Sequence, residues 1–77
     1  MQKIKVELTF PPRLKNEAVI CNLCKKFNVT VNILEASFST ETGWAIIIIE
    51  GTEIEVTKAL EFLKAKDVEV KDTQRLI

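Results

Sequence analysis

Residues 29–51, VTVNILEASFSTETGWAIIIIEG, contain two strand-like runs joined by a short turn. The first run, Val29–Ser39, is rich in β-branched residues, and the second, Trp44–Ile49, is apolar at every position. The residues between them, 40–43, favour a hairpin connection with glycine at its end. We therefore predict two adjacent antiparallel strands in the middle of the chain.

A strand and a helix are predicted before this hairpin. Apolar residues from Ile4 to Phe10 alternate with polar ones, which is the pattern of a strand with one buried face. Pro11-Pro12 ends this strand, because proline cannot donate a hydrogen bond to the ladder. The stretch from Leu14 to Phe27 predicts a helix, with one apolar stripe made by Ile20, Leu23, Cys24 and Phe27.

A second helix and a last strand are predicted after the hairpin. Thr52-Glu53-Ile54-Glu55 has the capping-box pattern, and the helix it starts should end near Lys66. This helix presents Val56, Ala59, Leu60 and Leu63 on one side. Residues 67–71 alternate again and predict the last strand, and residues 72–77 are expected to form a tail.

The order strand–helix–strand–strand–helix–strand predicts one α+β domain over residues 1–77 with the ferredoxin-like βαββαβ fold. Right-handed crossovers place the first and third strands at the centre of a four-stranded antiparallel sheet, with both helices on one face.

Composition excludes several classes of protein. Lys+Arg and Asp+Glu number 11 each, so the chain lacks the basic excess typical of nucleic-acid binders and of proteins that bind anionic membranes. The longest apolar run, Trp44–Ile49, is far shorter than the roughly 20 residues needed to span a bilayer. Two cysteines without a signal peptide indicate reduced thiols, so we expect a cytoplasmic protein.

The sheet face away from the helices should be polar, but the central hairpin is apolar on both sides. Strict alternation assigns Val29, Val31 and Ile33 to the helix side. The outer face then carries Asn32, Leu34, Ala36 and Phe38 from the first run and Ile46 and Ile48 from the second. An apolar patch of this size predicts a dimer interface, a ligand site, or both; the alternative is that the residues after Asp72 fold back and cover it.

The chain has few residues suited to catalysis, and we predict that it is not an enzyme. It has no histidine or tyrosine and no glycine-rich phosphate loop. Cys21 and Cys24 form a C-x-x-C pair, but the predicted helix places both in mid-helix and Cys24 on its buried stripe. We expect no metal site and no cofactor. Glu35 and Glu41, near the hairpin, are candidates to pair with a ligand amine or to be solvated.

The segment Phe27–Leu34, and within it Asn32-Ile33-Leu34, resembles the signature of the NIL domain. That domain forms the C-terminal regulatory module of the ATP-binding subunits of bacterial methionine importers, and it also occurs as short free-standing proteins. The resemblance extends from the first strand to Val70 and includes Gly51-Thr52 and the closing Val68-Glu69-Val70.

The resemblance implies an ACT-like fold, a homodimer paired through its sheets, and methionine bound near that pairing. Carried over by position, it implies that Asn32 contacts the ligand and that Phe38 lines the apolar side chain. We expect a stand-alone copy, in which inhibition of an ATPase on the same chain does not operate.

The sequence thus predicts a small-ligand-binding regulatory or sensor module, with methionine or a related sulfur amino acid as the ligand. The expected ligand-binding residues are Asn32, Leu34, Phe38, Ile46 and Ile48, and the expected homodimer interface comprises Asn32, Leu34, Ala36 and Phe38. Two alternatives remain open. One is a ligand-free module that docks on a transporter or a sulfur-metabolism enzyme, and the other is sulfur or electron transfer through Cys21 and Cys24.

Overall fold

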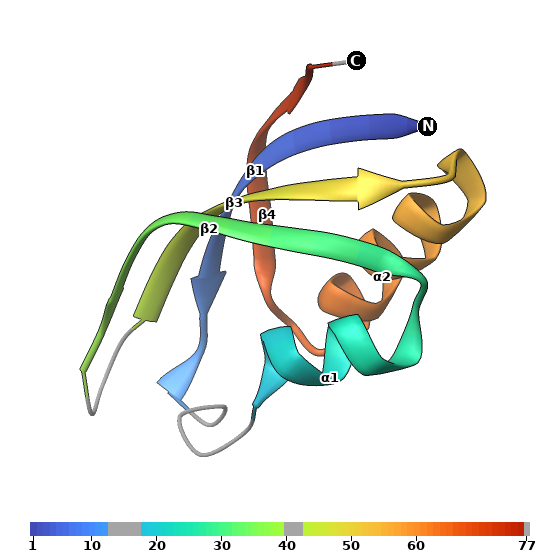
Figure 1. Ribbon diagram of the computed structural model, residues 1–77. Coiled ribbons are helices and arrows are strands. Elements are labelled where there is room, and N and C mark those ends of the chain that lie inside the picture. The colour runs from blue at the N-terminus through green and yellow to red at the C-terminus, as the bar shows by residue number, and fades with distance from the viewer. Residues whose placement is uncertain (13–17, 40–42, 77) are drawn as a thin grey trace.

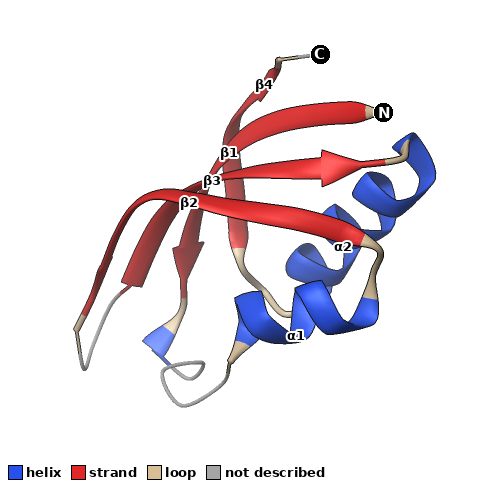
Figure 2. Cartoon of the chain, in the orientation of Figure 1, coloured by secondary structure: helices blue, strands red, loops and turns tan. Residues whose placement is uncertain are grey.

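The computed structural model describes residues 1–12, 18–39 and 43–76. Its elements, in chain order, are β1 (Gln2–Phe10), α1 (Val19–Lys26), β2 (Val29–Phe38), β3 (Gly43–Gly51), α2 (Glu53–Ala65) and β4 (Glu69–Arg75). The four strands form one antiparallel sheet in the order β2-β3-β1-β4, and both helices lie on the same side of it (Figures 1 and 2). This is the ferredoxin-like βαββαβ fold that the sequence predicts, with the first and third strands at the centre.

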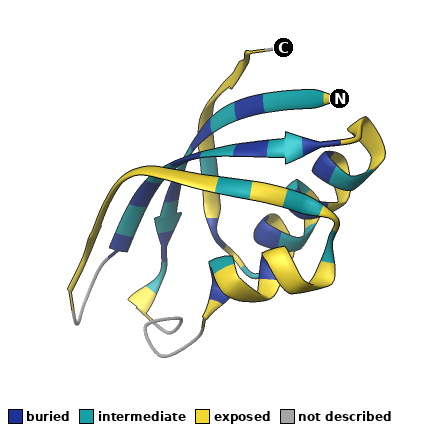
Figure 3. Cartoon of the chain, in the orientation of Figure 1, coloured by how far each residue is buried: buried dark blue, intermediate teal, exposed yellow. Residues whose placement is uncertain are grey.

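The core lies between the sheet and the helices. Every second residue of β1 and β3 is buried, and the buried side chains of the sheet join those of the helices in one apolar cluster (Figure 3). The helices contribute to this cluster Val19, Leu23, Val56, Ala59 and Leu63. The alternating strands and the helical stripes of the sequence therefore meet in a single layer, as their periodicities predict.

Helix α1 begins later than its pattern predicts. Ala18 is its N-cap residue, and residues 14–17 of the predicted helix lie outside the described part of the chain. Leu23 is buried and Ile20 and Phe27 pack against the core, as predicted, but Cys24 is exposed. The prediction that both cysteines lie in mid-helix is wrong for Cys21, which is the third residue of α1.

Helix α2 begins and ends as its sequence predicts. The side chain of its N-cap residue Thr52 accepts a hydrogen bond of 3.2 Å from the backbone N–H of Glu55. The Glu55 carboxylate does not complete a capping box but accepts from the backbone N–H of Asn28, at 2.9 Å. This bond ties the start of α2 to the turn between α1 and β2.

Strand β4 continues to Arg75, so the prediction of a tail from residue 72 is wrong for Asp72–Arg75. The strand contains a bulge: Glu7 of β1 pairs with Lys71 and Lys5 with Gln74, so two residues of β4 oppose one of β1. Asp72, at the start of this bulge, has φ 52°. The strand signal in the sequence ends at Lys71 because residues 72–75 are all polar, so no polar–apolar alternation marks this part of β4.

No helix in the described residues is both long and apolar enough to cross a membrane.

Candidate functional site

The sheet face opposite the helices, called here the outer face, carries an apolar stripe along β3. Trp44, Ile46 and Ile48 are half-buried and point away from the core residues Ala45, Ile47 and Ile49. On β1 the residues opposite this stripe are polar, because Thr9 pairs with Trp44, Glu7 with Ile46 and Lys5 with Ile48. Since no helix covers this face, the stripe is half-buried only by the side chains on either side of it.

A β-bulge at Leu34 divides β2 into two parts. Odd-numbered residues face the helices before the bulge and the outer face after it. Ile33 pairs with Ile47 and Glu35 with Ile46, so Leu34 is the extra residue. Before the bulge, Asn32 is opposite Ile48 on the outer face. After it, Glu35 and Ser37 take the outer face, and Ala36 and Phe38 are opposite Ala45 and Gly43 on the helix side.

The prediction that Asn32, Leu34, Ala36 and Phe38 share the outer face is therefore wrong. The Phe38 ring lies 5.6 Å, between centroids, from that of Phe10, which faces the core. A Cβ atom at Gly43 would lie 2.5 Å from Cδ1 of Phe38, so glycine leaves the space that this ring takes. Strict alternation fails because a bulge inserts one unpaired residue, which reverses the facing of every residue after it.

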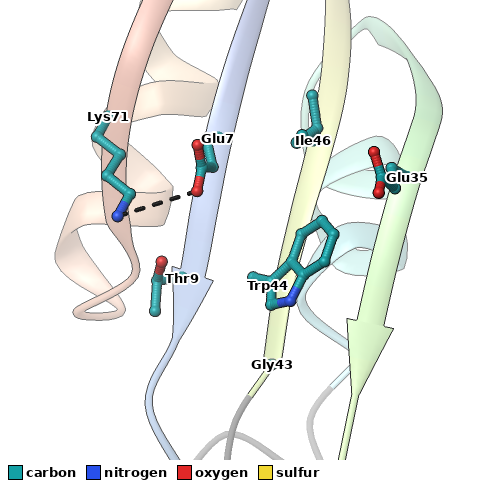
Figure 4. Close-up of a pocket in the computed structure, with 7 residues that line it drawn as sticks. All are labelled: Glu7, Thr9, Glu35, Gly43, Trp44, Ile46 and Lys71. Carbon is teal, nitrogen blue, oxygen red and sulfur yellow. Dashed lines mark ion pairs between the residues drawn. The ribbon is translucent and has the colours of Figure 1, made fainter.

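A shallow hollow of about 370 Å³ lies on the outer face at the lower end of the stripe (Figure 4). Trp44 and Ile46 form its apolar part, and the other lining residues are Glu7, Thr9, Glu35, Gly43 and Lys71. Nζ of Lys71 lies 3.9 Å from Oε1 of Glu7 on one side, and Glu35 stands across β3 on the other side. The hollow therefore offers an aromatic and aliphatic surface between one ammonium group and two carboxylates.

These groups match the parts of a free amino acid with an apolar side chain. A carboxylate binds an ammonium group, an ammonium binds a carboxylate, and Trp44 and Ile46 can hold the apolar part. The two carboxylates are on different strands, and Glu7 and Glu35 are both paired with Ile46 of β3, which lies between them. Within the described residues, no cluster of three or more side chains suited to bind a metal exists.

The predicted site residues are only partly brought together. Asn32, Ile46 and Ile48 share the outer face, and Ile46 also lines the hollow. Leu34 is at the bulge with 49% of its surface exposed, and Ala36 and Phe38 lie on the helix side. Sequence reasoning missed Glu7, Thr9, Trp44 and Lys71, although alternation in β1 and β3 places the first three of them on the outer face.

Strand β2 forms one edge of the sheet and carries a second apolar feature. Ile33, Leu34 and Phe38 are 52%, 49% and 61% exposed, because β2 bends away beyond the cover of the helices (Figures 1 and 3). An exposed edge strand with large apolar side chains is suited to contact another polypeptide.

The βαββαβ order and the four-stranded antiparallel sheet with one uncovered face define a ferredoxin-like domain. The NIL domain family model matches residues 5–72, and the chain belongs to that family.

Three proteins are similar to this chain in sequence. The chain is 32% identical over 74 residues to a methionine import ATP-binding protein of Streptococcus mutans, and 31% identical over 70 residues to one of Bacillus licheniformis. It spans about a fifth of the length of these two relatives. An uncharacterised protein of Synechococcus elongatus is 26% identical, with 96% of each chain covered.

Among solved structures, the C-terminal domain of an ABC transporter ATP-binding protein from Enterococcus faecalis has the same fold. Its TM-score is 0.72 at 21% identity, with 94% of this chain and 81% of that one covered.

Proposed function

We propose that this domain is a non-catalytic regulatory module of the cytoplasm that binds methionine or a related sulfur amino acid on the outer face of its sheet. The observation that carries the proposal is the hollow around Trp44 and Ile46, with Lys71 beside Glu7 and with Glu35 across β3. Two relatives are methionine import ATP-binding proteins, which supports the choice of ligand class.

The amino acid is oriented by its charged ends. Its ammonium group lies between the Glu7 and Glu35 carboxylates, and its carboxylate contacts the Lys71 ammonium group. The thioether lies along Trp44 and Ile46, because sulfur makes favourable contacts with aromatic rings and a flexible chain adapts to a shallow surface. The bulge at Leu34 has a direct part in this site, since without it Glu35 would point to the helix side.

Asn32 and Ile48 extend the site along the same face. Asn32 is opposite Ile48, two positions along β3 from Ile46. An asparagine amide can both donate and accept hydrogen bonds, so Asn32 is suited to contact either end of a bound amino acid or the backbone of a second chain.

The site is completed by a second copy of the domain. Ligand sites commonly bury 70–90% of the ligand surface, which an open hollow on one chain does not do. The apolar stripe of Trp44, Ile46 and Ile48 continues past the hollow, so two outer faces in contact would cover both the stripe and the ligand. Asn32 and Leu34 stay in this interface proposal, whereas Ala36 and Phe38 leave the outer face.

A second function is favoured by the exposed edge of β2. Ile33, Leu34 and Phe38 would contact a transporter subunit or a sulfur-metabolism enzyme, and no amino acid would be needed for this contact. The two proposals differ in what they expect from free amino acids.

The test uses Trp44, the single tryptophan of the chain, as a reporter inside the hollow. Methionine should change its fluorescence in a saturable titration and should raise the thermal midpoint with concentration, since a ligand of the native state stabilises it by mass action. Glu35→Gln should weaken binding about tenfold or more, because it removes a charged hydrogen bond worth about 1.5–3 kcal/mol. Asn32→Ala should weaken binding as well.

Lys64→Ala, an exposed change on α2, is the control and should bind as the unchanged protein does. A flat titration with all amino acids would contradict the ligand proposal and favour the docking function. Binding that is unchanged in Glu35→Gln would move the ligand away from the hollow.

A further inference from the structure

We propose that Cys21 and Cys24 form a binding site for a soft monovalent metal ion, with cuprous copper as the ion it takes. Both cysteines are free and exposed on α1, three residues apart. This site lies on the helix layer and does not depend on the proposed ligand site on the outer face.

The exposure of the two thiols is the first argument. Free cysteine is among the most buried residue types in proteins, where it acts as a small apolar side chain. In α1 the core positions are filled by Val19 and Leu23 instead, and neither cysteine belongs to the buried cluster. Packing in the core therefore does not explain why either position is a cysteine.

Their spacing favours a metal bridge over a disulfide. Residues three apart on a helix have Cβ atoms about 5–6 Å apart, whereas a disulfide needs a Cβ–Cβ distance of about 3.5–4.5 Å. A disulfide would thus require α1 to deform. A metal ion held by two thiolates, with bonds of about the 2.3 Å length of zinc–thiolate bonds, keeps the sulfur atoms up to roughly 4.6 Å apart, a separation that helical geometry allows.

The number of side chains that can bind a metal here indicates which ion the site takes. The chain has no histidine, and the described residues hold no group of three or more His, Cys, Asp or Glu side chains that could share a metal. Structural zinc is almost always bound by four ligands. A pair of thiolates instead suits cuprous copper, which is soft and prefers sulfur.

The charges on α1 are consistent with this ion. Binding of one cuprous ion by two thiols releases two protons to solvent and leaves a bis-thiolate complex of net charge −1, with no electron transferred. The helix sequence VICNLCKK contains Lys25 and Lys26 and no carboxylate, so the nearest charges on the element oppose the charge of the complex.

The experiment titrates the reduced chain of residues 1–77 with cuprous copper under anaerobic conditions, in competition with a coloured cuprous chelator. We expect uptake of one ion per chain. Cys21→Ser and Cys24→Ser should each lose this uptake, and Asn22→Ala, which changes the exposed residue between them, should keep it.

Because both cysteines are exposed, the serine variants should fold with unchanged thermal midpoints and should keep the Trp44 response to added amino acids. If a serine variant does not fold, the alanine variant at that position takes its place. Full uptake by either single-cysteine variant, no uptake by the unchanged chain, or zinc bound at one ion per two chains would each overturn the proposal.

Discussion

At the scale of single residues, two aspartates have a left-handed backbone. Asp67 has φ 64° and Asp72 has φ 52°. Asp67 follows the C-cap of α2, where the N–H of Val68 donates to the carbonyl of Leu63 and the N–H of Asp67 to that of Lys64. This pair of bonds is the Schellman motif, whose left-handed residue is most often glycine.

We therefore expect Asp67→Gly to raise the free energy of unfolding by about 0.5–1 kcal/mol, because glycine adopts a positive φ without a Cβ clash. Asp67→Ala, which keeps the Cβ and removes the carboxylate, should lower it. Urea unfolding measures both changes as shifts of the midpoint, and the dependence of the unfolding free energy on urea concentration should stay unchanged. Equal midpoints for the glycine and alanine variants would contradict this account of the helix end.

Leu34 shows how one residue can change the site. As the extra residue of the β2 bulge, it brings Glu35 to the outer face beside Ile46 and turns Phe38 toward Phe10. The bulge therefore changes the chemistry of the proposed ligand site, because the outer face carries the Glu35 carboxylate and not the Phe38 ring.

At the scale of elements, the N-terminus of α2 holds two parts of the fold together. Thr52 caps the helix through Glu55, and Glu55 receives the N–H of Asn28 from the turn before β2. Oε2 of Glu55 also lies 3.7 Å from Nζ of Lys58; the Lys58 side chain is exposed and the Glu55 side chain is half-buried, and the contribution of such a surface pair to stability is small.

Thr52→Ala should lower the free energy of unfolding by about 1 kcal/mol, because it leaves the N–H of Glu55 without its side-chain acceptor. Thr57→Ala, an exposed change within the same helix, should have no such cost and is the matched control. Thermal or urea unfolding of both variants decides the point. Equal loss at the two positions would show that helix propensity, and not the cap, sets the effect.

At the scale of the whole molecule, the two layers leave the sheet covered on one side only. Core side chains fill the helix side, and the outer face carries Trp44, Ile46 and Ile48 between polar neighbours. A second copy that covers this stripe would give each chain the layer that its own two helices do not provide.

Ile48→Lys should therefore convert the proposed dimer to a monomer and weaken methionine binding with it. Ile54→Lys is the control, because Ile54 on α2 is 68% exposed and distant from the outer face in the fold. Solution mass by light scattering measures the outcome. A dimer that survives Ile48→Lys but fails when β2-edge residues are changed would place the contact at the sheet edge instead.

The sequence by itself determined the fold class, the central position of β1 and β3, the core positions of those strands, and Thr52 as the N-cap residue of α2. These features follow from local periodicity and capping chemistry, which hold wherever the backbone is regular. It also placed Asn32, Ile46 and Ile48 on the uncovered face. The family of the chain could be read from the residues around Asn32, and the family model matches residues 5–72.

Only the tertiary structure decided which other side chains share that face. The bulges at Leu34 and after Lys71 are irregularities of strand pairing, and an extra residue in a strand leaves no periodic signal in the sequence. For this reason strict alternation does not place Glu35 beside Ile46, and it puts Phe38 on the wrong side of the sheet. The start of α1 at Val19 and the exposure of Cys24 were likewise not evident from the apolar spacing of residues 14–27.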